Sequence, residues 1–367
     1  MDNLPEHLLS SIAHYLNTRI ETISFRSVCN SFRSSAPPPL PPRSHIKIPS
    51  PPGLTDDGHL ELTESTIYAI QPPEKSTETW LVKVEESNSG KIRVMDPLFK
   101  LRIKNMLPES FNLLDYRVKE IAKSCRLETV SSSKTCYVRK AVVSSDDDNA
   151  GEFVLMALIN DGRVGVWRSK DERWTNIDIG YKSFNCKDII YHKNKFYAMG
   201  FDGFTVAVDP KSFKVTQAAA ASEKSQSHLM MHSLVKSRND LFLINTYWLY
   251  KYFQHGPLFG RISLDVFKLD KDNCKWIEED GLKDQNLFLG EDGSFMLSAK
   301  EFPSHKGNCG YLIYADLSGI NYDPRKENIA YFDLEDPSPG SQPAALSKYS
   351  EAFWPLPTWL GQKQNCR

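Results

Sequence analysis

The chain has 367 residues, of which 40% are hydrophobic and 25% are charged, and its formal net charge is −1. This length allows a small module and one large globular domain, and the near-zero charge excludes the basic field that nucleic-acid binding requires. The seven cysteines form no Cys-x-x-Cys pair, and the longest apolar run, residues 153–159, is too short to cross a membrane. We therefore expect an intracellular protein of the nucleus, the cytoplasm or both, with neither nucleic acid nor a membrane as a partner.

The first 36 residues predict two short amphipathic helices. In the first helix, the apolar positions that share a face are Leu4, Leu8, Ile12 and Leu16, and Leu9 widens that face. In the second helix, the corresponding positions are Phe25, Val28, Cys29 and Phe32. Two helices this short bury too little surface to enclose a core of their own, so we expect them to need a partner.

Capping patterns place the start of each helix. Asn3 and Glu6 have the three-residue spacing of a capping pair, and Pro5 suits the first turn, where a missing N–H costs little. Thr18 and Glu21 repeat the spacing at the start of the second helix.

The N-terminal pattern resembles an F-box. The family has Leu-Pro, an apolar residue three or four positions later, Ile one turn further, and then Arg-x-Val-Cys before an aromatic residue. The matching positions are Leu4-Pro5, Leu8-Leu9, Ile12, Leu16, residues 25–29 and Phe32, where the family often has Trp.

The resemblance implies docking on a Skp-type adaptor, which joins the chain to a cullin-based ubiquitin ligase. In physical terms, an apolar helical stripe would lie in a groove of another helical protein. The implied adaptor-binding residues are Leu4, Pro5, Leu8, Leu9, Ile12, Leu16, Phe25, Val28, Cys29 and Phe32. The alternative interpretation is an ordinary helical hairpin that packs on its own domain.

Residues 37–59 are rich in proline and predict a semi-rigid extended linker between the F-box-like module (1–36) and the remaining domain (60–367). Such a linker would hold the two modules at a set distance. Residues 38–43 also fit a PxxPxR ligand for an SH3-type groove, although a simple spacer has the same composition.

From about residue 60 the sequence predicts short strands separated by turns. Asp-Gly and Asn-Asp-Gly turns between alternating segments are strong hairpin signals. The expected strands are 80–84, 92–95, 153–159, 164–167, 188–191, 195–199, 205–208, 240–244, 262–268, 276–277, 311–315 and 328–333. Residues 115–123 interrupt this series with a predicted helix, because Val118, Ile121 and Ala122 have helical spacing.

Three stretches share one layout of strand, charged turn and outer strand with a large side chain. They are 164–174, 206–213 and 264–276. Their recurrence about every 40 to 60 residues is typical of propeller blades. The sequence therefore predicts a mainly β fold, a kelch-like β-propeller of five to seven blades, with a large two-sheet sandwich as the alternative.

A second resemblance covers this domain. Residues 96–98, 107–108, 112–118, 328–333 and 357–359 are similar to a signature of a plant F-box subfamily, whose C-terminal domain was long catalogued as a domain of unknown function. The resemblance implies a kelch-like propeller that recruits a target protein.

Catalytic motifs are mostly absent: the sequence has no Gly-x-Ser-x-Gly elbow, no Walker loop, no Gly-x-Gly-x-x-Gly and no His-Glu-x-x-His. His228 and His232 are four residues apart but lack a spaced Cys or carboxylate, and the acidic run at 146–149 lacks the later calcium ligands. We therefore expect no cofactor, no metal and no catalytic residue.

A dense aromatic segment is a candidate target-binding surface, and its residues are Tyr247, Trp248, Tyr250, Tyr252 and Phe253. The alternative is that these rings fill space between blades. Together the patterns favour a non-catalytic substrate receptor of an SCF-type (Skp-cullin-F-box) ubiquitin ligase. An adaptor-bound scaffold outside ubiquitination and a propeller enzyme are the other hypotheses.

Overall fold

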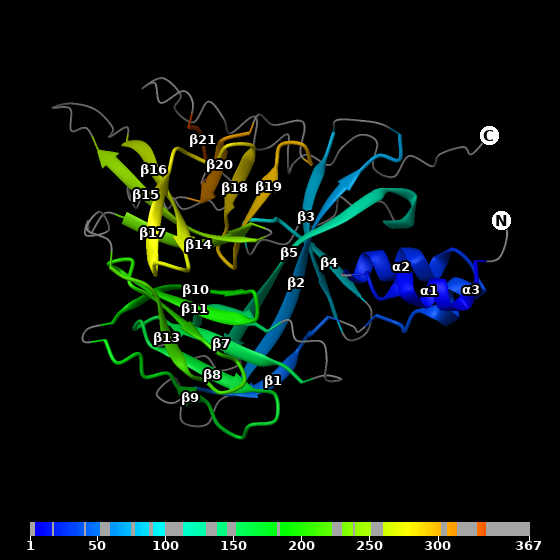
Figure 1. Cartoon of the computed structure of the whole chain (residues 1–367), viewed down its shortest axis with the longest axis horizontal. Helices are drawn as coiled ribbons and strands as arrows, with labels where there is room; N and C mark the ends of the chain where they lie inside the picture. The colour runs from blue at the N-terminus through cyan, green and yellow to red at the C-terminus, as the bar shows by residue number, and fades with distance from the viewer. Residues whose placement is uncertain are drawn as a thin grey trace.

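The computed structural model contains a ring of β-sheets, and three helices lie against one side of that ring (Figure 1). The described residues are 4–16, 18–39, 42–51, 59–74, 78–87, 91–99, 113–129, 138–144, 152–181, 184–221, 230–237, 239–250, 260–301, 307–313 and 329–334. The predicted mainly β fold with an N-terminal helical module is confirmed.

The helical module consists of α1 (Glu6–Ala13), α2 (Arg19–Ser27) and α3 (Asn30–Ser35). The predicted cap of α2 is confirmed: the Glu21 amide donates to the Thr18 hydroxyl, and the Thr18 amide donates to the Glu21 carboxylate. At α1, Pro5 is the N-cap and supplies no side-chain hydrogen bond, while Asn3 lies outside the described residues. Among all the residues that the structure describes, no helix is long and apolar enough to cross a membrane.

The second predicted helix is divided in two, which corrects the sequence prediction. Cys29 has an extended backbone (φ −165°, ψ −179°), so α2 ends at Ser27 and α3 begins at Asn30. Serine and asparagine at the break offer side-chain hydrogen bonds that compete with the helical ones. Val28 and Cys29 therefore lie between helices, whereas the Phe25 and Phe32 rings still meet, with centroids 4.8 Å apart.

The first sheet has nine strands and divides into two blades. Its strands are β1 (Ile46–Pro49), β2 (His59–Gln71), β3 (Trp80–Glu86), β4 (Ile92–Met95), β5 (Arg117–Thr129), β6 (Val138–Val143), β7 (Val154–Ile159), β8 (Val164–Arg168) and β9 (Thr175–Asn176). The order is β4-β3-β2-β5-β6-β7-β8-β9, with β1 paired to β2. Only one residue pair, Cys125 with Ala141, joins β5 to β6. We therefore call β2–β5 blade 1 and β6–β9 blade 2.

Three four-stranded sheets complete the ring. Blade 3 contains β10 (Cys186–His192), β11 (Lys195–Gly200), β12 (Thr205–Val208) and β13 (Val215–Ala219). Blade 4 contains β14 (Met230–Ser237), β15 (Asp240–Tyr250), β16 (Gly260–Asp270) and β17 (Lys275–Glu279). Blade 5 contains β18 (Gln285–Leu289), β19 (Ser294–Ser298), β20 (Cys309–Ile313) and β21 (Ile329–Asp333), with β19 at its inner edge.

One strand of each blade faces the centre, and these strands form a closed circle. β6 contacts β10, β10 contacts β14, β14 contacts β19, and β19 contacts β5, which pairs with β6. The described residues thus form five blades, within the predicted range of five to seven.

An apolar layer fills each boundary between neighbouring blades. Going round the ring, the layers include Leu62 and Leu155, then Val166 and Phe196, then Met199 and Leu243, then Ile244 and Leu287, and finally Phe288 and Ile67. Because the last layer returns to blade 1, the hydrophobic core is itself a ring.

The repeated sequence layout corresponds to the third strand and the following turn of three consecutive blades, at β8, β12 and β16. The predicted outer strand begins only after Trp174 and Phe213 in the first two repeats, whereas Trp276 lies within β17. The large side chain in each repeat fastens the outer edge of its blade. The indole N–H of Trp174 donates to the Pro49 carbonyl at 2.6 Å, and that of Trp276 donates to the Gly203 carbonyl at 2.9 Å. The Phe213 ring lies 4.2 Å from the Arg168 guanidinium.

The predicted helix at 115–123 is wrong. These residues form the end of a short 3₁₀ helix, η1 (Leu113–Asp115), and the first half of β5. A β-bulge at Ile121 puts Ile121 and Ala122 against the blade 5 layer, while Val118 faces the opposite side. The bulge interrupts the two-residue period, and the resulting pattern mimics a helix.

The predicted linker also needs a correction. Residues 46–49 form β1, which pairs antiparallel with the first residues of β2. This part of the 37–59 segment therefore belongs to the propeller rather than to a spacer.

Candidate adaptor-binding face

The helical module encloses a small core, contrary to the expectation that helices this short have none. Leu9, Phe25 and Ala36 are buried, and the side chains that pack around them are Ala13, Leu16 and Phe32. Arg26 fixes α2 to α3, because its guanidinium donates to the carbonyls of Arg33 and Ala36.

A row of apolar side chains on α1 and in the residues next to its two ends faces away from this core. Leu4, Leu8 and Ile12 are 45%, 42% and 43% exposed. Tyr15 continues the row and is 81% exposed, and Val28 is 54% exposed. Soluble domains seldom leave large apolar side chains in a contiguous row unless a partner covers them.

The predicted adaptor-binding residues therefore divide into two groups. The exposed group is Leu4, Pro5, Leu8, Ile12, Val28 and Cys29, and the inward group is Leu9, Leu16, Phe25 and Phe32. The exposed group is available to a partner. In the inward group, Leu9 and Phe25 are buried and Leu16 and Phe32 are half-buried, and these side chains hold α1 in place. Sequence reasoning missed Tyr15, although its position three residues after Ile12 was the available signal.

The module packs directly on the face of blade 1 (Figure 1). Ile20 of α2 is 5% exposed and lies in one apolar cluster with Tyr68, Ile70, Trp80 and Val82. Sequence reasoning missed this contact, because Ile20 lies off the predicted stripe.

An ion pair reinforces the docking. The Arg19 guanidinium binds both carboxylate oxygens of Glu86 on β3, one of them at 3.3 Å, and each side chain is 25% exposed. The hydrogen bond and charge of Glu86 raise the pKa of Arg19. Burial raises the pKa of Glu120, on the neighbouring β5, above its usual range.

We expect that Arg19→Glu loosens the module and that Arg19→Glu with Glu86→Arg restores it. A bidentate charged pair contributes about 2 kcal/mol, so the single change should speed hydrogen exchange of the α2 amides about 30-fold. Hydrogen exchange measured by mass spectrometry on the full chain checks this. Equal exchange in the single and the double variant would show that the pair does not fix the module.

Only part of the aromatic candidate surface lies in the described residues. Tyr247 is half-buried on β15, and its hydroxyl donates to the Asp265 carboxylate on β16. Trp248 and Tyr250 pair with β16 through their backbones, and Tyr252 and Phe253 lie outside the described residues. Tyr247 thus serves at least one contact within blade 4.

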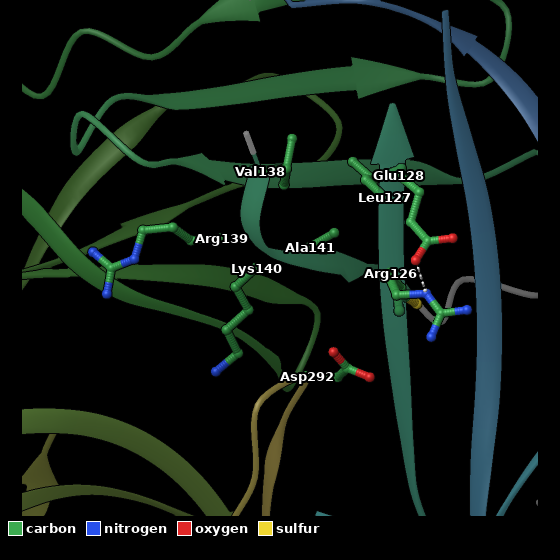
Figure 2. Close-up of a pocket in the computed structure, with 9 residues that line it drawn as sticks. Arg126, Leu127, Glu128, Val138, Arg139, Lys140, Ala141 and Asp292 are labelled. Atoms are coloured by element: carbon green, nitrogen blue, oxygen red, sulfur yellow. Dashed lines mark ion pairs between the residues drawn. The ribbon is translucent and has the colours of Figure 1, made fainter. Parts of the chain in front are cut away.

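A small polar pocket lies between β5 and β6 (Figure 2). Arg126 pairs with Glu128 at 2.9 Å and with Glu85 at 3.1 Å. Asp292, which enters the pocket from the β18–β19 turn, pairs with Lys83 at 3.3 Å. These carboxylates are already neutralised by cations, which suits structural ion pairs better than proton transfer.

The pocket also contains Lys140 and Cys125. The Lys140 ammonium lies 2.7 Å from the Asp188 carboxylate. Burial raises the pKa of the Cys125 thiol well above its usual range, so this cysteine stays protonated and is a poor nucleophile.

The two weak metal candidates gain no support. His232 Nδ1 lies 2.8 Å from the Asn245 amide oxygen, while His228 and the 146–149 run are outside the described residues. Across the described part of the chain, no group of three or more His, Cys, Asp or Glu side chains could hold a metal ion.

A five-bladed ring with a helical module docked on its first blade defines a β-propeller protein with an apolar contact face outside the ring. The family model described as KIB1-4 beta-propeller matches residues 59–333, and the chain belongs to this family.

The relatives found among known proteins carry F-box names. "F-box protein SKIP23" of Arabidopsis thaliana is 28% identical and covers 97% of this chain and 94% of the relative. "F-box/kelch-repeat protein At2g24250" of the same plant is 27% identical and covers 87% of this chain and 83% of the relative. The recognition of a plant F-box protein with a kelch-like propeller is confirmed.

Proposed function

We propose that the chain is the substrate-recognition subunit of an SCF-type ubiquitin ligase. The helical module binds a Skp-type adaptor and, through it, a cullin, while the propeller binds a target protein. The exposed row Leu4, Leu8 and Ile12 carries the proposal, because it leaves α1 with an uncovered apolar face. The proposed place of action is the nucleus, the cytoplasm or both.

In this proposal the chain performs no bond chemistry. Its contribution is to hold the target near a ubiquitin-conjugating enzyme, which raises the local concentration of the reacting groups. The paired charges of the polar pocket between β5 and β6 support a structural rather than a catalytic role for that pocket. The docking of α2 on blade 1 supports a fixed orientation between adaptor and propeller.

The test is reconstitution of the full chain with a purified Skp-type adaptor and cullin, followed by size-exclusion chromatography. We expect one complex that contains all three proteins. A complex with the adaptor that excludes the cullin would favour a scaffold outside ubiquitination. Failure to bind the adaptor would contradict the proposal, and the propeller would then have to be tested for a different function.

A further inference from the structure

Four lysine side chains gather at the boundary between blades 3 and 4. Lys193 and Lys195 come from the β10–β11 hairpin, Lys236 from the end of β14, and Lys271 from the β16–β17 turn. All four residues are exposed as a whole, although the Lys236 ammonium group lies partly buried against the Tyr191 carbonyl. Within the described chain, none of the four ammonium groups has a carboxylate within 4.0 Å. We call these four residues the lysine cluster.

The charges of Lys193 and Lys195 act on Lys271, and three of the four lysines act on one shared neighbour, His192. Burial, followed by the charges of Lys193 and Lys195, lowers the pKa of Lys271. His192 is only 4% exposed, and burial together with Lys271, Lys236 and Lys193 lowers its pKa to about 4. Because His192 is neutral at pH 7, it adds no positive charge to that of the lysines.

The carboxylates of the adjoining turns make their hydrogen bonds and ion pairs with groups outside the lysine cluster. Asp209 accepts hydrogen bonds from the Ser212 amide and hydroxyl, both at 2.7 Å. Asp270 accepts from the Asn273 side chain at 2.7 Å. Asp240 pairs with another lysine, Lys268, at 3.0 Å. These groups stabilise their own turns. The charges of Asp209 and Asp240 act on Lys195 and Lys271 only from beyond ion-pair distance, so the positive charge of the lysine cluster is compensated in part.

Lys236 extends the cluster toward the centre of the ring. Its ammonium group donates to the Tyr191 carbonyl at 3.2 Å, and burial followed by the charges of Lys123 and Lys140 lowers its pKa. The cluster thus runs from the outer turn of blade 4 to the inner strand of the same blade.

We propose that the lysine cluster binds an acidic segment of the target protein, with its carboxylate or phosphate groups placed between blades 3 and 4. The proposal rests on the receptor function and adds the chemical class of the target segment. An anion placed here would relieve the repulsion among the lysines and would find donors from three separate turns or strand ends. Because the whole chain has a net charge of −1, this attraction is local rather than a general property of the surface.

The test measures peptide binding by fluorescence anisotropy with the full chain. The probes are a fluorescein-labelled peptide of alternating Glu and Gly, the same peptide with phosphoserine at the Glu positions, and a Lys-Gly peptide as the negative control. We expect the two acidic peptides to bind, with affinity that falls as salt rises, and the Lys-Gly peptide not to bind. The stronger of the two acidic peptides identifies whether carboxylate or phosphate is preferred.

Lys193→Gln with Lys271→Gln should weaken acidic-peptide binding at least tenfold, and Lys195→Gln with Lys236→Gln should do the same. The matched control is Lys170→Gln with Lys283→Gln, which removes the same charge from lysines that already pair with Glu152 and Glu279. This control should change the affinity less than twofold.

Three results would overturn the proposal: no binding of either acidic peptide, equal weakening by all three double variants, or stronger binding of a labelled single-stranded DNA through the same lysines. Adaptor binding by the same variants separates this proposal from the receptor function. If the variants and the wild type all bind the adaptor while the acidic peptides do not bind, only the lysine-cluster proposal fails. Lys193, Lys195 and Lys271 are exposed and should tolerate Gln, whereas Lys236→Gln also removes the hydrogen bond to the Tyr191 carbonyl. An unchanged thermal midpoint verifies that each variant is folded.

Discussion

Leu8→Ala with Ile12→Ala should weaken adaptor binding strongly while leaving the propeller folded. Both side chains are more than 40% exposed in the free chain, so they add little to folding but are available to a partner groove. Burial of a Leu or Ile side chain contributes roughly 1.5–3 kcal/mol, and part of that is gained only on docking. The pair should therefore contribute about 2–4 kcal/mol of binding, which corresponds to roughly 30-fold to 1,000-fold in Kd.

Two companion variants make this result specific, with Kd measured by calorimetry and folding by the thermal midpoint. Ser10→Ala with His14→Ala changes two exposed polar residues of the same segment and should leave the Kd unchanged. Leu9→Ala should lower the stability of the helical module, because Leu9 is 1% exposed within the small core. An unchanged Kd in the Leu8, Ile12 variant would show that the adaptor contacts a different surface.

The sequence could predict the apolar stripe of the first helix. It could not predict which of these side chains are exposed and which are buried in the small core. Leu8 and Leu9 are adjacent and both fit the family pattern, yet one faces outward and the other is buried. That difference depends on where α3 and Ala36 pack, which is a tertiary contact without a local sequence signal. The break at Cys29 was missed as well, because the pattern of apolar residues continues across it.

The propeller could be predicted because its signals are local and repeated. Asp-Gly turns and the large residues after the third strand mark three blades, and Trp174 and Trp276 prove to fasten blade edges. Blade 1 was harder to recognise. Its inner strand, β5, carries a bulge at Ile121, which interrupts the two-residue period. The sequence before β5 shows no clear alternation of apolar and polar residues. The docking of Ile20 was hidden as well, because its partners lie about 50 to 60 positions further along the sequence and had no recognisable pattern.

In the proposed function, the helical module and the lysine cluster together determine how the target is oriented relative to the adaptor. Arg19 and Ile20 fasten the module to blade 1, and the closed circle of inner strands connects blade 1 rigidly to blades 3 and 4. A target held at the lysine cluster would therefore keep a constant orientation to the adaptor. Its reachable lysines would be determined by that geometry rather than by the length of a flexible spacer.

The ring depends on the contact between its first and last blades, so Lys83→Met should destabilise the whole propeller by about 3–5 kcal/mol. The Lys83 ammonium on β3 lies 3.3 Å from the Asp292 carboxylate in the β18–β19 turn, and the two side chains are only 2% and 5% exposed. Removal of the lysine leaves a carboxylate buried without its cation, which is costly in a low-dielectric interior.

Urea unfolding of three further variants identifies the cause of that loss. Lys83→Met with Asp292→Leu should recover most of the stability, because no charge is then left buried alone. Lys170→Met removes an exposed partner of Glu152 and should cost less than about 1 kcal/mol. Asp292→Asn, which keeps the shape but removes the negative charge, should fall between the wild type and Lys83→Met. If Lys83→Met were no worse than Lys170→Met, the apolar layer of Phe288, Phe295 and Ile67 would close the ring without help from this ion pair.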